Sequence, residues 1–316
     1  MLVLVGLLQW GCGGSPNAEP TQRWLLEPGD SLPELLSEVG LYEDVAALEA
    51  YADVLRYVPN HPLYSNGLGK ERHLYLPEGA AVEVDEAQGW DFPVGVVLAK
   101  TFSYEGEPVE TRLLFRTSEG WDYGLYQWLP DGSDAEVLRG NWAEVPLDLG
   151  DGELTHTLPS RLDCRTCHET HEDVSATPVI GISKLQTGAD LLATEIFSRP
   201  PTTTPVQGRT DEETAALSYF VGNCITCHNG GDSINSSFSL YPEDAVANTV
   251  DRPTESETGE GIRVVAGDPE RSVLYITVVE AGATGYRGPF KMMPPIGGNI
   301  IDPDASAILG AWIENL

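Results

Sequence analysis

The sequence contains the pentapeptide Cys-x-x-Cys-His twice, and this repetition constrains the chain more than any other feature. The first copy covers residues 164–168 and the second covers residues 224–228. Together they use four of the five cysteines, so only Cys12 is left and no pair remains for a structural disulfide bond. At average amino-acid usage such a pentapeptide occurs by chance in roughly one chain in a thousand of this length, so two copies indicate a common function.

Cys-x-x-Cys-His is the sequence to which haem c is attached through two thioether bonds, with the histidine as an iron ligand. We therefore predict two covalently bound haem c groups, each containing iron. The candidate residues are Cys164, Cys167, His168, Cys224, Cys227 and His228. Two alternatives remain open: the four cysteines hold a zinc ion, or each pair forms a thioredoxin-like dithiol. Neither alternative requires a histidine after both second cysteines, and the haem interpretation is therefore favoured.

The amino terminus resembles the end of a bacterial lipoprotein signal. Residues 1–10 are largely apolar, and Gly11 and Cys12 are followed by a polar, Pro-containing stretch. The resemblance implies a signal segment and linker over residues 1–25, with a lipidated Cys12 that anchors the protein to a membrane. An unmodified Cys12 thiol is the alternative. Because haem c is attached outside the bacterial cytoplasmic membrane, we expect a periplasmic protein or an outer-membrane or cell-surface lipoprotein.

The pattern of apolar residues changes along the chain. The spacing of Leu and Val over residues 31–57 predicts short helices that form an entry segment. Short apolar or alternating runs follow, with a turn signal at Glu105-Gly106, and predict an antiparallel β-rich domain over residues 26–160. Residues 161–209 contain the first haem motif and a linker rich in Pro and Thr. The predicted fold class is a multidomain α+β protein.

The last part of the chain, residues 210–316, resembles a class I cytochrome c domain. A predicted helix leads into the second motif, Met293 precedes two prolines, and an amphipathic helix with Trp312 closes the chain. The resemblance implies a mainly α-helical domain in which the Met293 sulfur binds iron on the face opposite His228. Met292 is the competing ligand.

No motif specifies the second axial ligand of the first haem. We rank His156 first among the remaining histidines, ahead of His171, His73 and His61. A His or Lys ligand would give a low-spin haem that only relays electrons. An open position would instead bind peroxide or another small ligand and allow catalysis.

Much of the chain from about Leu32 onward resembles a family of bacterial diheme c-type cytochromes with a β-rich N-terminal half. The matching segments all lie before the first haem motif: residues 36–42, 62–67, 70–72, 92–95, 110–114 and 159–161. The resemblance implies a two-haem architecture. It names no reaction, so whether the protein is also an enzyme stays open.

Charge restricts the partners, because the formal charge is 18 − 49 = −31. Such a chain is not expected to bind nucleic acid, and its acidic surface favours a basic redox partner protein. We predict an exported diheme c-type cytochrome that transfers electrons between a periplasmic or surface donor and acceptor. One alternative is a diheme peroxidase-like enzyme with an open site at the first haem, although its motifs are usually farther apart than 224 − 164 = 60 residues. The other alternative is a haem-containing binding or sensor module.

Overall fold

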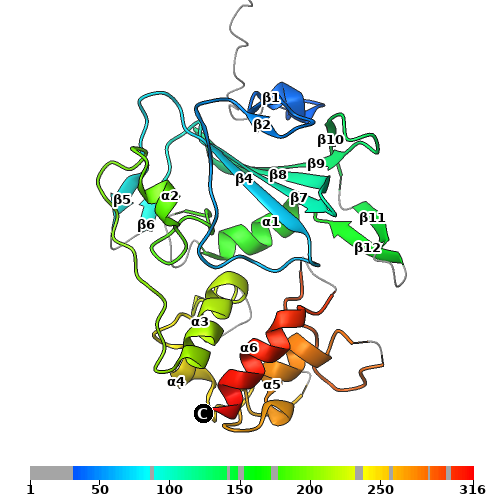
Figure 1. Cartoon of the computed structure of the whole chain (residues 1–316), viewed down its shortest axis with the longest axis vertical. Coiled ribbons are helices and arrows are strands. Elements are labelled where there is room, and N and C mark those ends of the chain that lie inside the picture. The colour runs from blue at the N-terminus through cyan, green and yellow to red at the C-terminus, as the bar shows by residue number, and fades with distance from the viewer. Residues whose placement is uncertain are drawn as a thin grey trace, which may run out of the picture.

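The computed structural model describes residues 31–85, 89–140, 143–148, 153–171, 177–231, 238–255, 259–283, 285–296 and 300–316. A large β-sheet part lies above a smaller part that contains the C-terminal helices (Figure 1). The predicted signal segment, residues 1–25 with Cys12, lies outside the described residues. Among the described residues, no helix is long and apolar enough to cross a membrane.

A six-stranded antiparallel sheet dominates the structure, with the strand order β10-β9-β8-β7-β4-β3. Its strands are β3 (Val54–Arg56), β4 (Gly69–Tyr75), β7 (Val97–Tyr104), β8 (Glu107–Thr117), β9 (Gly120–Trp128) and β10 (Ala135–Val137). Strands β7 and β8 are joined by Glu105 and Gly106, whose φ angles are +50° and +91°. Positive φ at both positions is typical of a tight hairpin turn, and glycine adopts it without steric cost. The turn predicted at Glu105-Gly106 is confirmed.

Three two-stranded sheets accompany the central sheet. They are β1 (Tyr42–Asp44) with β2 (Glu49–Ala50), β5 (Glu83–Asp85) with β6 (Gly89–Asp91), and β11 (Ala143–Asp148) with β12 (Glu153–Leu158). The first of these sheets and the 3-10 helix η1 (Leu36–Val39) pack on one face of the central sheet, against buried residues such as Ala99 and Leu113.

The opposite face of the central sheet packs against residues 161–209. Because side chains alternate along a strand, Leu98 and Leu114 point to this face while Ala99 and Leu113 point away from it. Helices α1 (Arg161–His168) and α2 (Ala189–Leu192) belong to the covering segment. Helix α1 therefore lies between the sheet and the C-terminal helices (Figure 1).

Helices α3 (Asp211–Asn223) and α6 (Pro303–Glu314) pack together in the lower part of the molecule. The rings of Phe220 and Trp312 meet edge to face between them, with 5.5 Å between centroids. Thr210 caps α3, because its hydroxyl accepts a 3.1 Å hydrogen bond from the N–H of Glu213. The remaining elements are η2 (Glu169–His171), α4 (Ala245–Thr249), η3 (Pro269–Arg271), α5 (Val273–Tyr275) and η4 (Ile276–Glu280).

The prediction of a mainly α-helical, cytochrome c-like domain over residues 210–316 is wrong. The protein is β-rich, with 29% strand and 23% helix, and the described residues contain six short α-helices. Between α3 and α6, helix α4 has five residues and α5 has three. Pro and Gly interrupt this stretch, and isolated bridges such as Val250↔Val264 pair its backbone groups across the chain instead of along helices.

Candidate functional site

Helix α1 presents the first Cys-x-x-Cys-His motif. Its start is fixed by a capping box, in which Ser160 Oγ accepts a 3.2 Å hydrogen bond from Asp163 N–H and Asp163 Oδ2 accepts one of 2.8 Å from Ser160 N–H. Positions three and four apart share one side of a helix, so Cys164, Cys167 and His168 are grouped on one side of α1. Cys164 is buried in the apolar cluster that covers the central sheet.

His168 is held by a backbone carbonyl. Its Nδ1 donates a 2.7 Å hydrogen bond to the oxygen of Pro178, and its ring lies 5.7 Å from that of Tyr123. A proton on Nδ1 leaves the lone pair on Nε2. Histidines that bind metals commonly donate their other ring N–H in this way, which fixes both the tautomer and the orientation of the ring. His168 therefore has the geometry expected of an iron ligand.

Helix α3 delivers the second motif at its carboxyl end. Cys224 is the C-cap of α3, and the backbone then turns so that the N–H groups of Cys227 and His228 both donate to the oxygen of Cys224, at 3.1 and 2.8 Å. The predicted helix leading into this motif is confirmed. The His228 ring lies against that of Phe238, with 4.6 Å between the ring centroids and 37° between the ring planes. Burial and the charge of Arg263 lower the pKa of His228 to about 4, so that the ring is neutral at pH 7, as metal binding requires.

The two motifs meet in space although they are far apart in sequence. Thr170, just after the first motif, donates from Oγ1 to the oxygen of Thr226 at 3.3 Å. Asn229, just after the second motif, donates from Nδ2 to the oxygens of Thr170 at 2.9 Å and Thr226 at 3.2 Å. The thiol of Cys167 is also close enough to raise the pKa of Cys227, after the larger effect of burial. We call this contact the motif junction.

The motif junction yields a stability prediction. Asn229 is buried, and Asn229→Ala removes the hydrogen bond that its amide donates to the Thr170 carbonyl and one of the two that the Thr226 carbonyl accepts. We therefore expect the free energy of unfolding to fall by about 1–3 kcal/mol. Asn315→Ala is the matched control, because Asn315 makes one exposed bond to Ala311 and its loss should change stability by less than about 0.5 kcal/mol. Urea unfolding of both variants measures the difference. Equal stabilities would show that the junction adds nothing.

The cysteines do not have the properties of a reactive dithiol. Burial raises the pKa of Cys164 to about 11, that of Cys224 to about 12 and that of Cys227 to about 11. A thioredoxin-like motif instead lowers a thiol pKa to make a nucleophile. Within the described ranges, no three His, Cys, Asp or Glu side chains are grouped as they would be around a metal ion.

Met293 lies beside the helical turn η4, where its N–H donates a 2.9 Å hydrogen bond to the oxygen of Thr277. Met292 is engaged elsewhere: its sulfur lies against Gly282, where an added Cβ would come within 2.5 Å of it. The structure thus places the Met293 backbone beside η4 and packs the Met292 sulfur against Gly282.

His156 is buried in a polar network on the sheet. Its Nε2 donates a 3.0 Å hydrogen bond to Glu110 Oε1, and its Nδ1 accepts one of 3.4 Å from the amide of Asn66. Both ring nitrogens are thus engaged, and His156 would bind iron only after giving up one of these bonds.

The other candidate histidines are spread over the molecule. His73 is buried, and its Nδ1 lies 3.3 Å from the hydroxyl oxygen of Tyr42. The backbone N–H of His61 donates a 2.9 Å hydrogen bond to Oε1 of Gln186. His171 ends η2, a few residues beyond the first motif.

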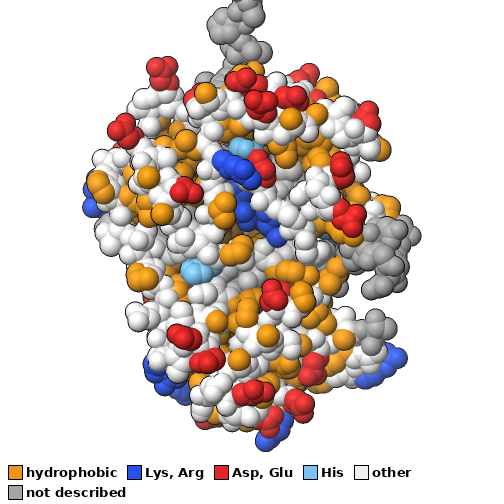
Figure 2. Space-filling view, in the orientation of Figure 1, with side chains coloured by type: hydrophobic (Ala, Val, Ile, Leu, Met, Phe, Trp, Pro, Cys, Tyr) orange, Lys and Arg blue, Asp and Glu red, His pale blue; other side chains and the backbone are white. Residues whose placement is uncertain are grey.

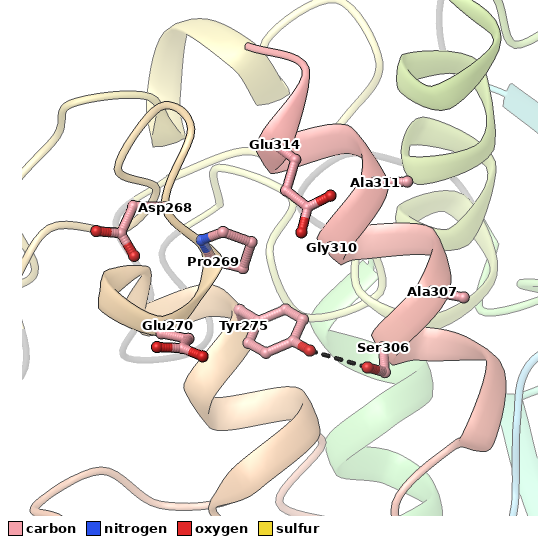
Figure 3. A pocket seen from close by; sticks show the side chains of 9 residues that line it. All are labelled: Asp268, Pro269, Glu270, Tyr275, Ser306, Ala307, Gly310, Ala311 and Glu314. Carbon is pink, nitrogen blue, oxygen red and sulfur yellow. Dashed lines mark hydrogen bonds between the residues drawn. The ribbon is translucent and has the colours of Figure 1, made fainter.

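A separate pocket lies between α6 and η3, with a volume of about 410 Å³. Figure 3 shows its lining, which includes Asp268, Glu270 and Glu314 as well as Tyr275 and Ser306, joined by a 2.8 Å hydrogen bond. None of the predicted haem or iron ligands lines it. The candidate site is therefore the pair of motifs and not this acidic pocket.

Sequence reasoning found the two motifs but missed the residues that support them. The carbonyl of Pro178, the motif junction and the basic side chains of the neighbouring sheet carry no local sequence signature. Comparisons of the chain with protein-family models, with curated proteins and with solved structures found no match.

Proposed function

We propose that the chain is an exported diheme c-type cytochrome that transfers electrons between a donor and an acceptor protein. The motif junction is the observation that carries the proposal. It supports two attachment sites held against each other by hydrogen bonds, at a separation fixed by the fold. Electron transfer from one haem to the other needs this arrangement, because the rate of transfer falls steeply as the distance between the two haems increases.

Each motif has the residues that haem c requires. The thiols of Cys164 and Cys167 would hold one group, and His168, oriented by the Pro178 carbonyl, would bind its iron. The second motif supplies the same set of residues at 224–228, with a histidine that burial keeps neutral. Bound haem iron supplies reversible one-electron chemistry. The protein's part is to orient the ligands, exclude water and hold the two sites together.

The surface suggests the kind of partner. The chain has 49 acidic residues and 18 basic ones, and Asp and Glu side chains are spread over the face shown in Figure 2. Such a surface attracts a basic redox protein over distances of about 10 Å at 0.1 M salt. Export and anchoring through Cys12 belong to the same proposal, because haem c attachment takes place outside the cytoplasmic membrane.

A redox titration of the full-length protein, matured in a host that attaches haem c, tests the proposed function. Optical and paramagnetic resonance spectra should show two low-spin haems, each reduced by one electron and unchanged by peroxide or cyanide. A high-spin haem with peroxide turnover would contradict a pure relay and favour the peroxidase-like alternative. The rate of electron transfer to a basic redox protein should fall with added salt if the acidic surface steers association.

The proposed iron ligand on the face opposite His228 has its own test. We expect Met293→Ala to lose the sulfur-to-iron absorption band and to lower one midpoint potential, because a thioether is a soft neutral ligand that favours reduced iron. Met292→Ala is the matched control and should keep both, since its sulfur packs against Gly282. The opposite pattern would assign the ligand to Met292.

A further inference from the structure

Three basic side chains form a row across the central sheet, on the face that is turned toward α1. Arg72 on β4 is paired with Lys100 on β7, and Lys100 is paired with Arg112 on β8. Directly opposed residues of antiparallel strands have Cβ atoms about 4.5–5.5 Å apart, and like charges there are destabilising. We call these three residues the basic row.

A buried phenyl ring draws the cations of this face together. Phe102 is fully buried and has Arg112 Cζ at 4.4 Å, Lys100 Nζ at 4.6 Å and Lys70 Nζ at 5.8 Å from its centroid. Figure 2 shows Lys and Arg side chains gathered in a hollow near the middle of one face, whereas most other charged side chains on that face are acidic.

The nearby acids do not balance these charges. Within the described part of the chain, Glu110 is the one carboxylate at ion-pair distance from the cluster, and it pairs with Arg112 at 2.5 Å. Asp302 raises the pKa of Lys70 from longer range, but burial and the neighbouring arginines lower it by more. Burial and the neighbouring cations lower the pKa of Lys100 well below its usual value and that of Lys70 to about 8. Cations gathered without matching carboxylates in a partly buried place are costly unless an anion occupies it.

The basic row extends away from the first haem motif. Leu74, Leu98 and Leu114 lie two residues along the same strands and belong to the cluster that contains Cys164. Cys164 thus packs beside the strand segments that carry the basic row. Arg72 stands two strand spacings from Arg112, or about 10 Å. An anion on the row is therefore beside whatever is bonded to this cysteine.

We propose that the basic row binds the propionate carboxylates of the porphyrin attached at Cys164 and Cys167. This inference rests on the proposed function, because it takes the first motif to hold haem. The thioether bonds fix one edge of the porphyrin and the propionates lie on the opposite edge, so a row that starts at the motif and runs away from it can reach them. The planar guanidinium group of Arg72 suits a carboxylate, which it can bind through two parallel hydrogen bonds. Arg112 already donates from Nε and Nη2 to Glu110 and adds its charge to the row.

Midpoint potentials of the haem-loaded, full-length protein test the proposal. Reduction adds an electron, and nearby cations stabilise the reduced state, so Arg72→Gln with Lys100→Gln should lower one of the two midpoint potentials and leave the other unchanged. The pH at which that potential begins to vary should also rise by about one to three units, because the propionate loses its cations. Lys100→Gln alone should show the same changes to a smaller extent. If the double variant does not fold, this single variant is measured in its place.

Arg271→Gln is the matched control, because Arg271 is exposed and, among the described residues, forms an ion pair only with Asp268, at 3.7 Å. Both potentials should therefore stay unchanged. Inorganic phosphate, compared with chloride at equal ionic strength, separates a propionate from a free oxyanion. It should leave the wild-type potentials unchanged, and a saturable shift that the double variant lacks would overturn the proposal. A lower potential without the change in pH dependence would also overturn it, since the row would then act only at a distance. A protein that holds no haem would contradict the proposed function itself.

Discussion

Cys164→Ser with Cys167→Ser halves the amount of covalently bound haem per polypeptide. A serine hydroxyl does not form the thioether bond to a vinyl group, so the first motif loses its attachment while the second keeps it. The second motif begins at the end of α3, whose core is shared with α6 and lies in a separate apolar cluster. Absorbance of the alkaline pyridine complex and intact mass together measure the haem content of the variant.

The corresponding double variant of the second motif, Cys224→Ser with Cys227→Ser, is the matched control and should also retain one haem. Changing all four cysteines should leave none. If the first double variant kept both haems, or if it lost both while still folded, the assignment of one haem to each motif would be contradicted.

Glu110→Ala should have the largest effect on stability of any single substitution considered. Glu110 has no exposed surface, accepts two hydrogen bonds from Arg112 at 2.5 and 3.1 Å, and accepts one from His156 at 3.0 Å. Removing one partner of a buried ion pair leaves an uncompensated charge, which costs about 3–5 kcal/mol. Glu34→Ala is the control: its pair with Arg139 is 76% and 48% exposed, and its loss should cost at most about 1 kcal/mol.

The same carboxylate predicts a pH dependence. Burial raises the pKa of Glu110, but Arg112 and His156 outweigh it and hold the pKa below its ordinary value of 4.5. The folded state then favours the ionised form of Glu110. The stabilisation that this carboxylate contributes to the folded state is present above pH 4.5 and is lost as the pH falls through its folded-state pKa. Urea unfolding should show that the difference in free energy of unfolding between wild type and Glu110→Ala becomes smaller in acid. A gap that is constant with pH would contradict an ionised Glu110.

The β-rich half was the part of the fold that local signals specified best. The turn at Glu105-Gly106 was predictable because positive φ favours glycine, and alternating runs predicted strands. The mainly helical C-terminal domain was predicted from resemblance at the two ends of the segment, in the helices now seen as α3 and α6. The sequence between them carries no helical periodicity strong enough to test that resemblance, and it folds into short turns.

The motifs of the candidate site were readable, but their surroundings were not. Thr170 and Asn229 are 59 residues apart, and the fold alone brings the segments that follow α1 and α3 together. Lys70 and Arg72 alternate visibly along one strand, yet strand register alone brings Lys100 and Arg112 beside them. His156 was ranked as a ligand because histidines are scarce, and only tertiary structure reveals that Glu110 and Asn66 engage both its nitrogens.

The central claim is that both Cys-x-x-Cys-His motifs hold covalent haem. Intact-mass analysis of the full-length protein, produced in a host that attaches haem c, tests it most directly. We predict the mass of the polypeptide plus two haems, retained after denaturation and extraction with acidified organic solvent. A colourless protein with the mass of the bare polypeptide would contradict the account.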